Sequence, residues 1–294
     1  MSKGGHNVMD FKRYVNAYVF ETALPGTKQE VSFKPISTGQ IKRLLLYETS
    51  NDADSIEKAL DQIISECVVS EDFNIDELYL QDRFYLLVDL RKATKGNTYN
   101  FQSKCGKCES QTQQSIKLSD LPVKTLDAPK ETVVKAKKAK ATTMKRGAKL
   151  IDGEDTPVQE APVTPVDSWG VIKLNENLSI KVRHNTRGDQ KEIRMRLETN
   201  DKLTPFQKSV EENTLMYAVS IQEVITPEGV DDKLTFEDKV YLIENIPQNE
   251  IEVITKWFED NDFGIDFSFD VKCIHCGNEE KKAIPLESFF FSAM

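Results

Sequence analysis

Apolar residues follow strand and helix periods along two stretches of the chain, and the first stretch begins near residue 19. Its residues 19–21 and 30–34 alternate between apolar and polar side chains, which predicts two strands joined by a turn at Leu24-Pro25-Gly26-Thr27. Apolar residues then recur every three or four positions, as they do on one face of a helix. We expect a helix capped by Ser37 or Thr38 that carries Ile41, Leu44 and Leu45, followed by helices near residues 55–67 and 80–92.

The second stretch repeats this order of elements. Residues 171–174 and 179–183 predict another hairpin, and helices are expected near residues 189–197, 205–224, 236–245 and 250–258. Pro205 suits the first turn of its helix, with Thr204 before it as the capping residue. Each stretch ends in a predicted strand, a Cys-x-x-Cys turn and a second strand. The fold class that follows is α+β.

The ends of the two stretches match each other without a gap. When Cys105 is aligned with Cys273, Cys108 falls on Cys276. Aromatic or apolar residues coincide at five further offsets, and the matched pairs are Phe101 with Phe269, Tyr99 with Phe267, Ile116 with Ile284, Leu118 with Leu286, and Leu121 with Phe289. Such internal similarity is typical of a duplicated unit. We therefore predict two related units, at residues 19–126 and 168–294, each with a hairpin, helices and a zinc-ribbon-like Cys knuckle.

A segment without aromatic residues separates the two predicted units. Residues 127–167 begin with a run of lysines and continue with an acidic half that contains Pro157, Pro162 and Pro165. This composition cannot bury enough apolar surface to offset the entropy lost on ordering. We predict a flexible linker here and an N-terminal arm at residues 1–18. The basic half of the linker has a second interpretation, as a contact for nucleic acid or for an acidic partner.

The two Cys-x-x-Cys pairs predict a structural Zn²⁺ site. Zinc in structural sites is held by four ligands in a tetrahedron, and one Cys-x-x-Cys turn supplies two of them. The predicted ligands are Cys105, Cys108, Cys273 and Cys276. Gly106 and Gly277 are expected to supply the positive φ angles that tight turns need. The simplest arrangement has one ion shared by the two units.

Three other interpretations of the cysteine pairs stay open. A redox dithiol requires a Cys-x-x-Cys that opens a helix within a βαβ pattern, and neither pair stands in that context. Two zinc ions, each completed by another protomer, satisfy the same spacing. So does a site of this kind that has lost its metal.

The remaining cysteine and the histidines are weaker ligand candidates. His275 lies inside the second turn, but four cysteines already complete a tetrahedron, so we expect it to face solvent or to support the ligands. His6 and His184 have no visible partner in the sequence. Cys67 ends an amphipathic helix, which predicts a buried core thiol.

Composition and missing motifs exclude several function classes. The net charge of −9 argues against a general nucleic-acid binder. No stretch approaches the roughly 20 apolar residues of a membrane span, and the N-terminus is not a secretory signal. Five cysteines in 294 residues favour a reducing compartment. Because motifs for phosphate binding and hydrolysis are missing and a four-thiolate site is closed, we predict that the protein is not an enzyme.

Several short segments carry a resemblance to a known family. They are 24–35 (LPGTKQEVSFKP), 43–46 (RLLL), 63–68 (IISECV) and 82–91 (DRFYLLVDLR). In order and spacing, the region from about Phe20 to Leu121 resembles the T4-like phage baseplate hub family, which includes the hub assembly protein of contractile tails. The sequence differs from that family pattern in its second, divergent copy and in its cysteine knuckles.

The resemblance implies a virion structural or assembly role in the baseplate hub, with other baseplate or tail proteins as partners and no membrane. The location it implies is the tail baseplate, or the host cytoplasm during assembly. Phe290 and Phe291 have no aromatic counterparts in the first copy, and two interpretations stay open: they anchor a partner, or they cover the zinc knuckle or an adjacent helix. Phe289 corresponds to Leu121, so we expect it in the core of its own unit. The alternative function is a zinc-ribbon module that acts on nucleic acid, for instance in transcription.

Overall fold

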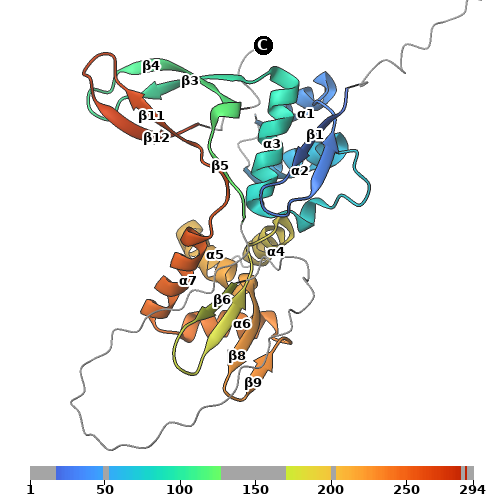
Figure 1. The fold of residues 1–294 in the computed structure, drawn as a ribbon, viewed down its shortest axis with the longest axis vertical. Helices are drawn as coiled ribbons and strands as arrows, with labels where there is room; N and C mark the ends of the chain where they lie inside the picture. Colours follow the sequence, from blue (N-terminus) through green and yellow to red (C-terminus); the bar gives the residue numbers. More distant parts are fainter. Residues whose placement is uncertain (1–17, 49–52, 127–169, 200–202, 286–288, 290–294) are drawn as a thin grey trace, which may run out of the picture. The chain divides into compact units, whose positions relative to one another are not determined.

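The computed structural model describes residues 18–48, 53–126, 170–199, 203–285 and 289, which combine helices with small antiparallel sheets (Figure 1). The predicted linker, and all but one residue of the predicted arm, lie outside the described residues. The chain forms two compact units, each assembled from separate segments. Unit 1 comprises Met1–Leu126, Asn185–Glu212 and Asp262–Met294, and unit 2 comprises Asp127–His184 and Asn213–Asn261. Both sequence copies thus contribute to unit 1, and the boundaries predicted at residues 126 and 168 stay a prediction.

Unit 1 begins with the predicted hairpin, formed by β1 (Phe20–Ala23) and β2 (Glu30–Phe33). Asp82, in the first turn of helix α3, accepts hydrogen bonds from the backbone N–H groups of Gly26 and Thr27 at 2.7 and 3.0 Å. A Cβ atom at Gly26 would lie 2.4 Å from the Phe263 ring, so the turn requires glycine. The hairpin is therefore fixed to the helix layer through its turn.

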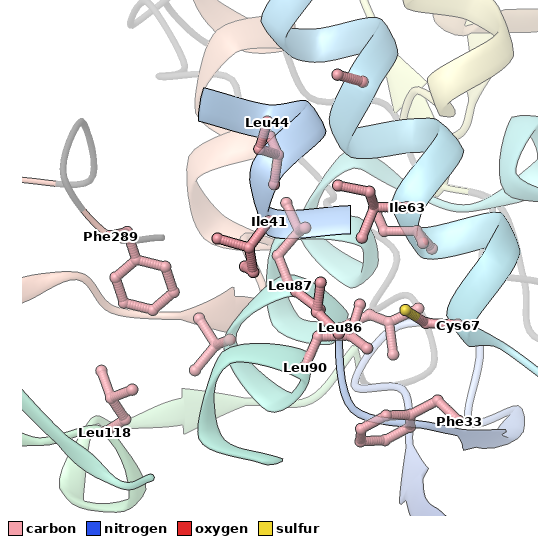
Figure 2. Close-up of a cluster of buried hydrophobic side chains, with 14 of the residues drawn as sticks. Phe33, Ile41, Leu44, Ile63, Cys67, Leu86, Leu87, Leu90, Leu118 and Phe289 are labelled. Atoms are coloured by element: carbon pink, nitrogen blue, oxygen red, sulfur yellow. The ribbon is translucent and has the colours of Figure 1, made fainter. Parts of the chain in front are cut away.

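Three helices follow, at α1 (Thr38–Glu48), α2 (Ala53–Cys67) and α3 (Leu80–Lys95), as predicted. Ser37 begins α1 with a capping box: its hydroxyl accepts from the Gln40 N–H at 3.3 Å, and its own N–H donates to the Gln40 side chain. Figure 2 shows the core between these helices, with the labelled residues Ile41, Leu44, Ile63, Leu86, Leu87 and Leu90.

Two predictions about this core have different outcomes. Cys67 is buried as expected, and burial raises the pKa of its thiol to about 11, so it behaves as an apolar core residue. Leu45, which was predicted to share the apolar face of α1, is 41% exposed instead. Ile41 and Leu44 form the buried face of α1, and Leu45 lies at the edge of the core.

Two longer hairpins complete the sheets of unit 1. One pairs β3 (Thr98–Lys104) with β4 (Gln111–Lys117), and the other pairs β11 (Ser268–Lys272) with β12 (Glu279–Ala283). A short ladder joins β5 (Val123–Lys124) to β10 (Gly264–Ile265). Phe289 is buried as predicted, but it packs against the first copy, with its ring centroid 5.1 Å from that of Tyr99. Arg91 of α3 donates a hydrogen bond to the Phe289 carbonyl oxygen at 3.1 Å.

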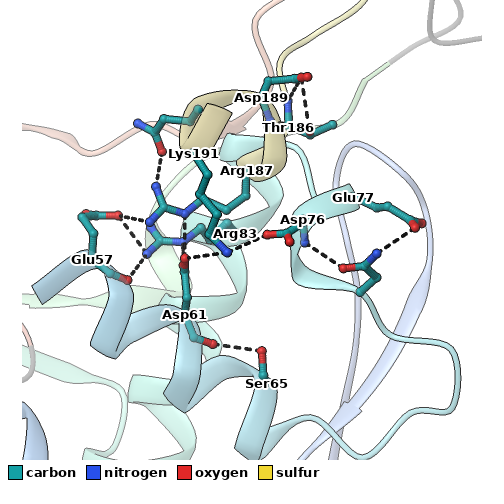
Figure 3. Close-up of polar contacts among 12 residues, drawn as sticks. Glu57, Asp61, Ser65, Asp76, Glu77, Arg83, Thr186, Arg187, Asp189 and Lys191 are labelled. Atoms are coloured by element: carbon teal, nitrogen blue, oxygen red, sulfur yellow. Dashed lines mark hydrogen bonds and ion pairs between the residues drawn. The ribbon is translucent and has the colours of Figure 1, made fainter. Parts of the chain in front are cut away.

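Helix α4 (Arg187–Glu198) joins unit 1 through a buried ion cluster, shown in Figure 3. Asp61 of α2 accepts from Arg83 of α3 at 2.7 Å and from Arg187 of α4 at 2.8 Å. Both arginine side chains are at most 2% exposed. Burial raises the pKa of Asp61, but the two guanidinium groups outweigh it, so that the pKa lies below its ordinary value. One carboxylate thus joins α2 and α3 to α4, whose Arg187 lies 126 positions after Asp61 in the sequence.

Unit 2 contains a four-stranded antiparallel sheet in the order β6-β7-β8-β9. Its strands are β6 (Gly170–Lys173), β7 (Ser179–Val182), β8 (Ile221–Thr226) and β9 (Gly229–Asp231). The second half of α5 (Pro205–Ser220) belongs to this unit, together with α6 (Phe236–Asn245) and α7 (Gln248–Asp260). The core lies between sheet and helices and includes Ile172, Ile180, Ile221, Ile254 and Trp257. No helix in the described part of the chain has both the length and the apolar character of a membrane span.

One sequence prediction for this region is wrong. The helix expected at residues 205–224 begins at Pro205 but ends at Ser220, and Ile221–Thr226 forms strand β8. Val224 pairs with Ile180 of β7 and with Asp231 of β9. β-branched residues at 221, 224 and 225 fit both a helical spacing and a strand, and the sheet pairing decides between them.

We predict that Asp61→Ala lowers the free energy of unfolding by about 3–5 kcal/mol, because it removes the carboxylate that balances the charges of two buried arginines. The matched control is Asp76→Ala, since Asp76 pairs with Lys191 at 2.6 Å but its side chain is 51% exposed. That change should cost less than about 1 kcal/mol. Urea denaturation of both variants checks the comparison, and equal losses would contradict a central role for Asp61.

Candidate metal centre

Each Cys-x-x-Cys pair forms the tip of one hairpin, between β3 and β4 or between β11 and β12. The two tips share the same backbone hydrogen bonds. Cys105 N–H donates to the Ser110 carbonyl at 2.9 Å, and Cys273 N–H donates to the Asn278 carbonyl at 2.8 Å. Glu109 N–H donates to the Cys105 carbonyl at 3.0 Å, and Gly277 N–H donates to the Cys273 carbonyl at 2.9 Å. The two knuckles therefore have equivalent backbone structures.

In each knuckle, the residue directly after the second cysteine has a left-handed backbone conformation, with a positive φ. It is Glu109 in the first knuckle, with φ 58°, and Gly277 in the second, with φ 70°. The prediction that Gly106 supplies a positive φ is therefore wrong, although the one for Gly277 is confirmed. Gly106 meets a different requirement, because a Cβ atom there would lie 2.8 Å from the Glu280 Oε2 atom of the opposite hairpin.

The four cysteines lie together, with their sulfur atoms all within 4.8 Å of one another. The Sγ atoms of Cys105 and Cys276 are 3.7 Å apart, and those of Cys108 and Cys273 are 3.6 Å apart. Four sulfurs placed about 2.3 Å from a central ion in a tetrahedron would be about 3.8 Å from each other. The arrangement therefore has the dimensions of a four-thiolate metal site.

Hydrogen bonds prepare part of this group for the thiolate form. The Ser110 hydroxyl, together with backbone N–H groups of Cys276 and His275, lowers the pKa of Cys273 to about 5. At Cys276 the backbone N–H of Asn278 lowers the pKa, but burial and the neighbouring thiols raise it more, to about 12. Four negative charges this close repel each other, so complete ionisation requires a cation among them.

Contacts between the hairpins hold the cysteines together. The rings of Phe101 and Phe269 meet edge to face, with centroids 5.1 Å apart. Gly106 N–H donates to the Glu280 carboxylate at 3.0 Å, and the Lys282 ammonium group donates to the Lys104 carbonyl. These contacts use no thiol, so the hairpins are positioned for metal by packing and by hydrogen bonds.

The other candidate residues lie elsewhere. His275 is exposed within the second knuckle and is not part of the four-sulfur group. His184 is buried in unit 2 against Trp257, and burial lowers its pKa to about 4. His6, Phe290 and Phe291 lie outside the described residues. Sequence reasoning missed Ser110 and Glu280, whose polar character was visible but whose positions depend on the pairing of the hairpins.

A family model described as "T4 bacteriophage base plate protein" matches residues 15–291, nearly the whole chain. The match extends beyond the region of residues 20–121, where short segments carry the resemblance, and it includes both cysteine pairs. No curated protein and no solved structure matches the chain significantly.

We predict opposite effects for substitutions at the two left-handed positions. Gly277→Ala should lower the free energy of unfolding by about 1–2 kcal/mol, because φ 70° is strained for alanine although no atom lies within 4 Å of the new Cβ. Glu109→Gly should be neutral or stabilising by up to about 1 kcal/mol. Glycine relieves the backbone strain of the positive φ at position 109, but it also raises the conformational entropy of the unfolded chain, which offsets part of that gain. Thermal unfolding of metal-loaded protein measures both, and a loss at Glu109→Gly as large as at Gly277→Ala would be inconsistent with these assignments.

Proposed function

The chain belongs to the T4 bacteriophage base plate protein family, and from this premise we propose that it is a structural or assembly component of the baseplate hub of a contractile tail. It acts by binding neighbouring baseplate or tail proteins, in the virion tail or in the host cytoplasm during assembly, and not by catalysis. The observation that carries this proposal is the family match over residues 15–291.

Exposed apolar side chains support a role in protein binding. Leu45, Leu46 and Tyr47 at the end of α1 are 41, 72 and 40% exposed, and they lie in or beside a segment that carries the family resemblance. Phe206, at the start of α5, is 78% exposed. Large apolar residues are common anchors of protein interfaces, where partners bury them.

The proposal includes a structural Zn²⁺ ion held by Cys105, Cys108, Cys273 and Cys276. The donor set of four thiols and the sulfur separations of 3.6 and 3.7 Å support it. Zinc bound in this way would neutralise part of the thiolate charge and fasten the two hairpins together. Because the four thiolates fill a tetrahedron, no position is left for a substrate or a reactive water, which supports a role without catalysis.

The charges of the hairpins argue against the alternative of a nucleic-acid module. Three of their lysines have acidic partners in the same region: Lys104 pairs with Glu109, Lys272 with Glu279 and Lys281 with Asp266. Phosphate binding requires a surface with net positive charge. Pairing of this kind reduces the positive charge that is available for such contacts.

Metal analysis tests the proposed site. We expect purified protein to contain one zinc per chain, and we expect the double substitution Cys273→Ser with Cys276→Ser to lose it, because two oxygen donors replace two thiolates. Cys67→Ser is the control, since Cys67 is buried in the helix core and outside the sulfur group. Two zinc ions per chain, or zinc retained by the double variant, would rule out the shared site.

Assembly in infected cells tests the hub role. Phage lacking this chain should fail to complete the baseplate hub, and the wild-type chain should restore it. Leu46→Lys should yield folded protein that enters baseplates less efficiently, because it places a charge in an apolar contact. Ser115→Lys, at an exposed position of β4, is the control and should behave as wild type. Hubs that assemble normally without the chain would refute the proposal.

A further inference from the structure

The metal centre is not symmetric, although its two knuckles have equivalent backbones. Ser110 in the first knuckle corresponds to Asn278 in the second, because each follows the second cysteine of its pair by two positions. The Ser110 hydroxyl oxygen lies 3.0 Å from the Cys108 sulfur and 3.4 Å from the Cys273 sulfur. It therefore contacts one thiol from each hairpin. Among the described residues, the Asn278 side chain makes no such contact.

The hydroxyl group has one proton, and when all four sulfurs are thiolates it can donate that proton to either of the two sulfurs it contacts. Cys108 also receives the backbone N–H of Ser110. The hydroxyl proton is then available to Cys273, which belongs to the opposite hairpin. A donated hydrogen bond stabilises a thiolate ligand and limits the motion of its side chain.

On the other side of the sulfur group, a different kind of side chain lies close to the ligands. Near Cys105 the second hairpin places the Glu280 carboxylate, which accepts the Gly106 N–H at 3.0 Å. An ionised carboxylate accepts hydrogen bonds and donates none, so it cannot support a thiolate in the way that a hydroxyl does. Of these two side chains, only Ser110 can donate to a sulfur of the other hairpin.

We propose that Ser110 is a positioning residue of the metal centre, whose hydroxyl holds Cys273 in the ligand set and thereby slows release of the metal. This inference rests on the proposed four-thiolate site. It assigns to one side chain a contact with a sulfur that lies 163 positions away in the sequence. The backbone of each knuckle orients its own two sulfurs, and Ser110 adds a contact between the knuckles at the sulfur atoms themselves.

The test compares three variants of the full-length protein: Ser110→Ala, Ser110→Thr and Asn278→Ala. Zinc is loaded first, and its transfer to an excess of a chromogenic chelator is then followed over time. Ser110→Ala should release zinc about tenfold faster, within the range seen when groups that support metal ligands are removed. Ser110→Thr keeps the hydroxyl and should release zinc at close to the wild-type rate. Asn278→Ala should match the wild type within about twofold, because its side chain contacts no sulfur.

A spectroscopic measurement separates this role from a general loss of stability. With Co²⁺ in place of zinc, the thiolate-to-metal charge-transfer band should shift in Ser110→Ala and remain in place in Asn278→Ala. Thermal unfolding of the metal-free forms should agree among all variants.

The possible failures are distinguishable. A wild-type chain that binds no metal would overturn the proposed site itself. A Ser110→Ala variant that binds metal but matches Asn278→Ala in rate and spectrum would overturn the role of Ser110 alone. A metal-free Ser110→Ala variant that melts well below the wild type would also overturn it, because the effect would then come from the fold.

Discussion

The pairing of the two cysteine hairpins is the constraint on which unit 1 depends, because it joins positions far apart in the chain. Cys105 and Cys276 are separated by 171 positions. Closing a loop of that length in an unfolded chain costs about 5 kcal/mol of entropy. An aromatic pair such as Phe101 with Phe269 contributes about 0.5–1.5 kcal/mol beyond its buried area. Zinc bound to such a set of thiolates would provide about 10–16 kcal/mol, so the proposed metal would exceed that cost by itself.

The residues that carry the family resemblance explain how the rest of unit 1 is held. Asp82 binds the turn at Gly26 and Thr27, and its neighbour Arg83 enters the ion cluster with Asp61. Buried ion pairs add little net stability compared with apolar packing, but a missing partner is costly, so they favour one arrangement of helices over others. These segments of the sequence therefore describe the internal framework of the fold, and the large apolar residues of the segments that remain exposed are Leu45, Leu46 and Phe84.

Local patterns were sufficient to predict much of the fold. The hairpins, the caps at Ser37 and Thr204, and the closeness of the four cysteines follow from short-range spacing and from the matched repeats. Other features depend on contacts between distant residues. Ile221–Thr226 became a strand because β7 and β9 pair with it, and Arg187 joined Asp61 across 126 positions. Gly106 was assigned the wrong role because its close neighbour, Glu280, belongs to the other hairpin.

The closed set of sulfur donors also bears on how the protein binds its neighbours. When four thiolates from one chain surround one ion, no coordination position remains for a partner. Several hairpin lysines are paired with acids of the same region, so part of their positive charge is compensated. Contacts with other baseplate proteins must then use side chains that the cores leave exposed, such as Leu46 and Phe206. The proposed metal would contribute to binding indirectly, by holding β11 and β12 in place, and metal loading and partner binding would then be separable by mutation.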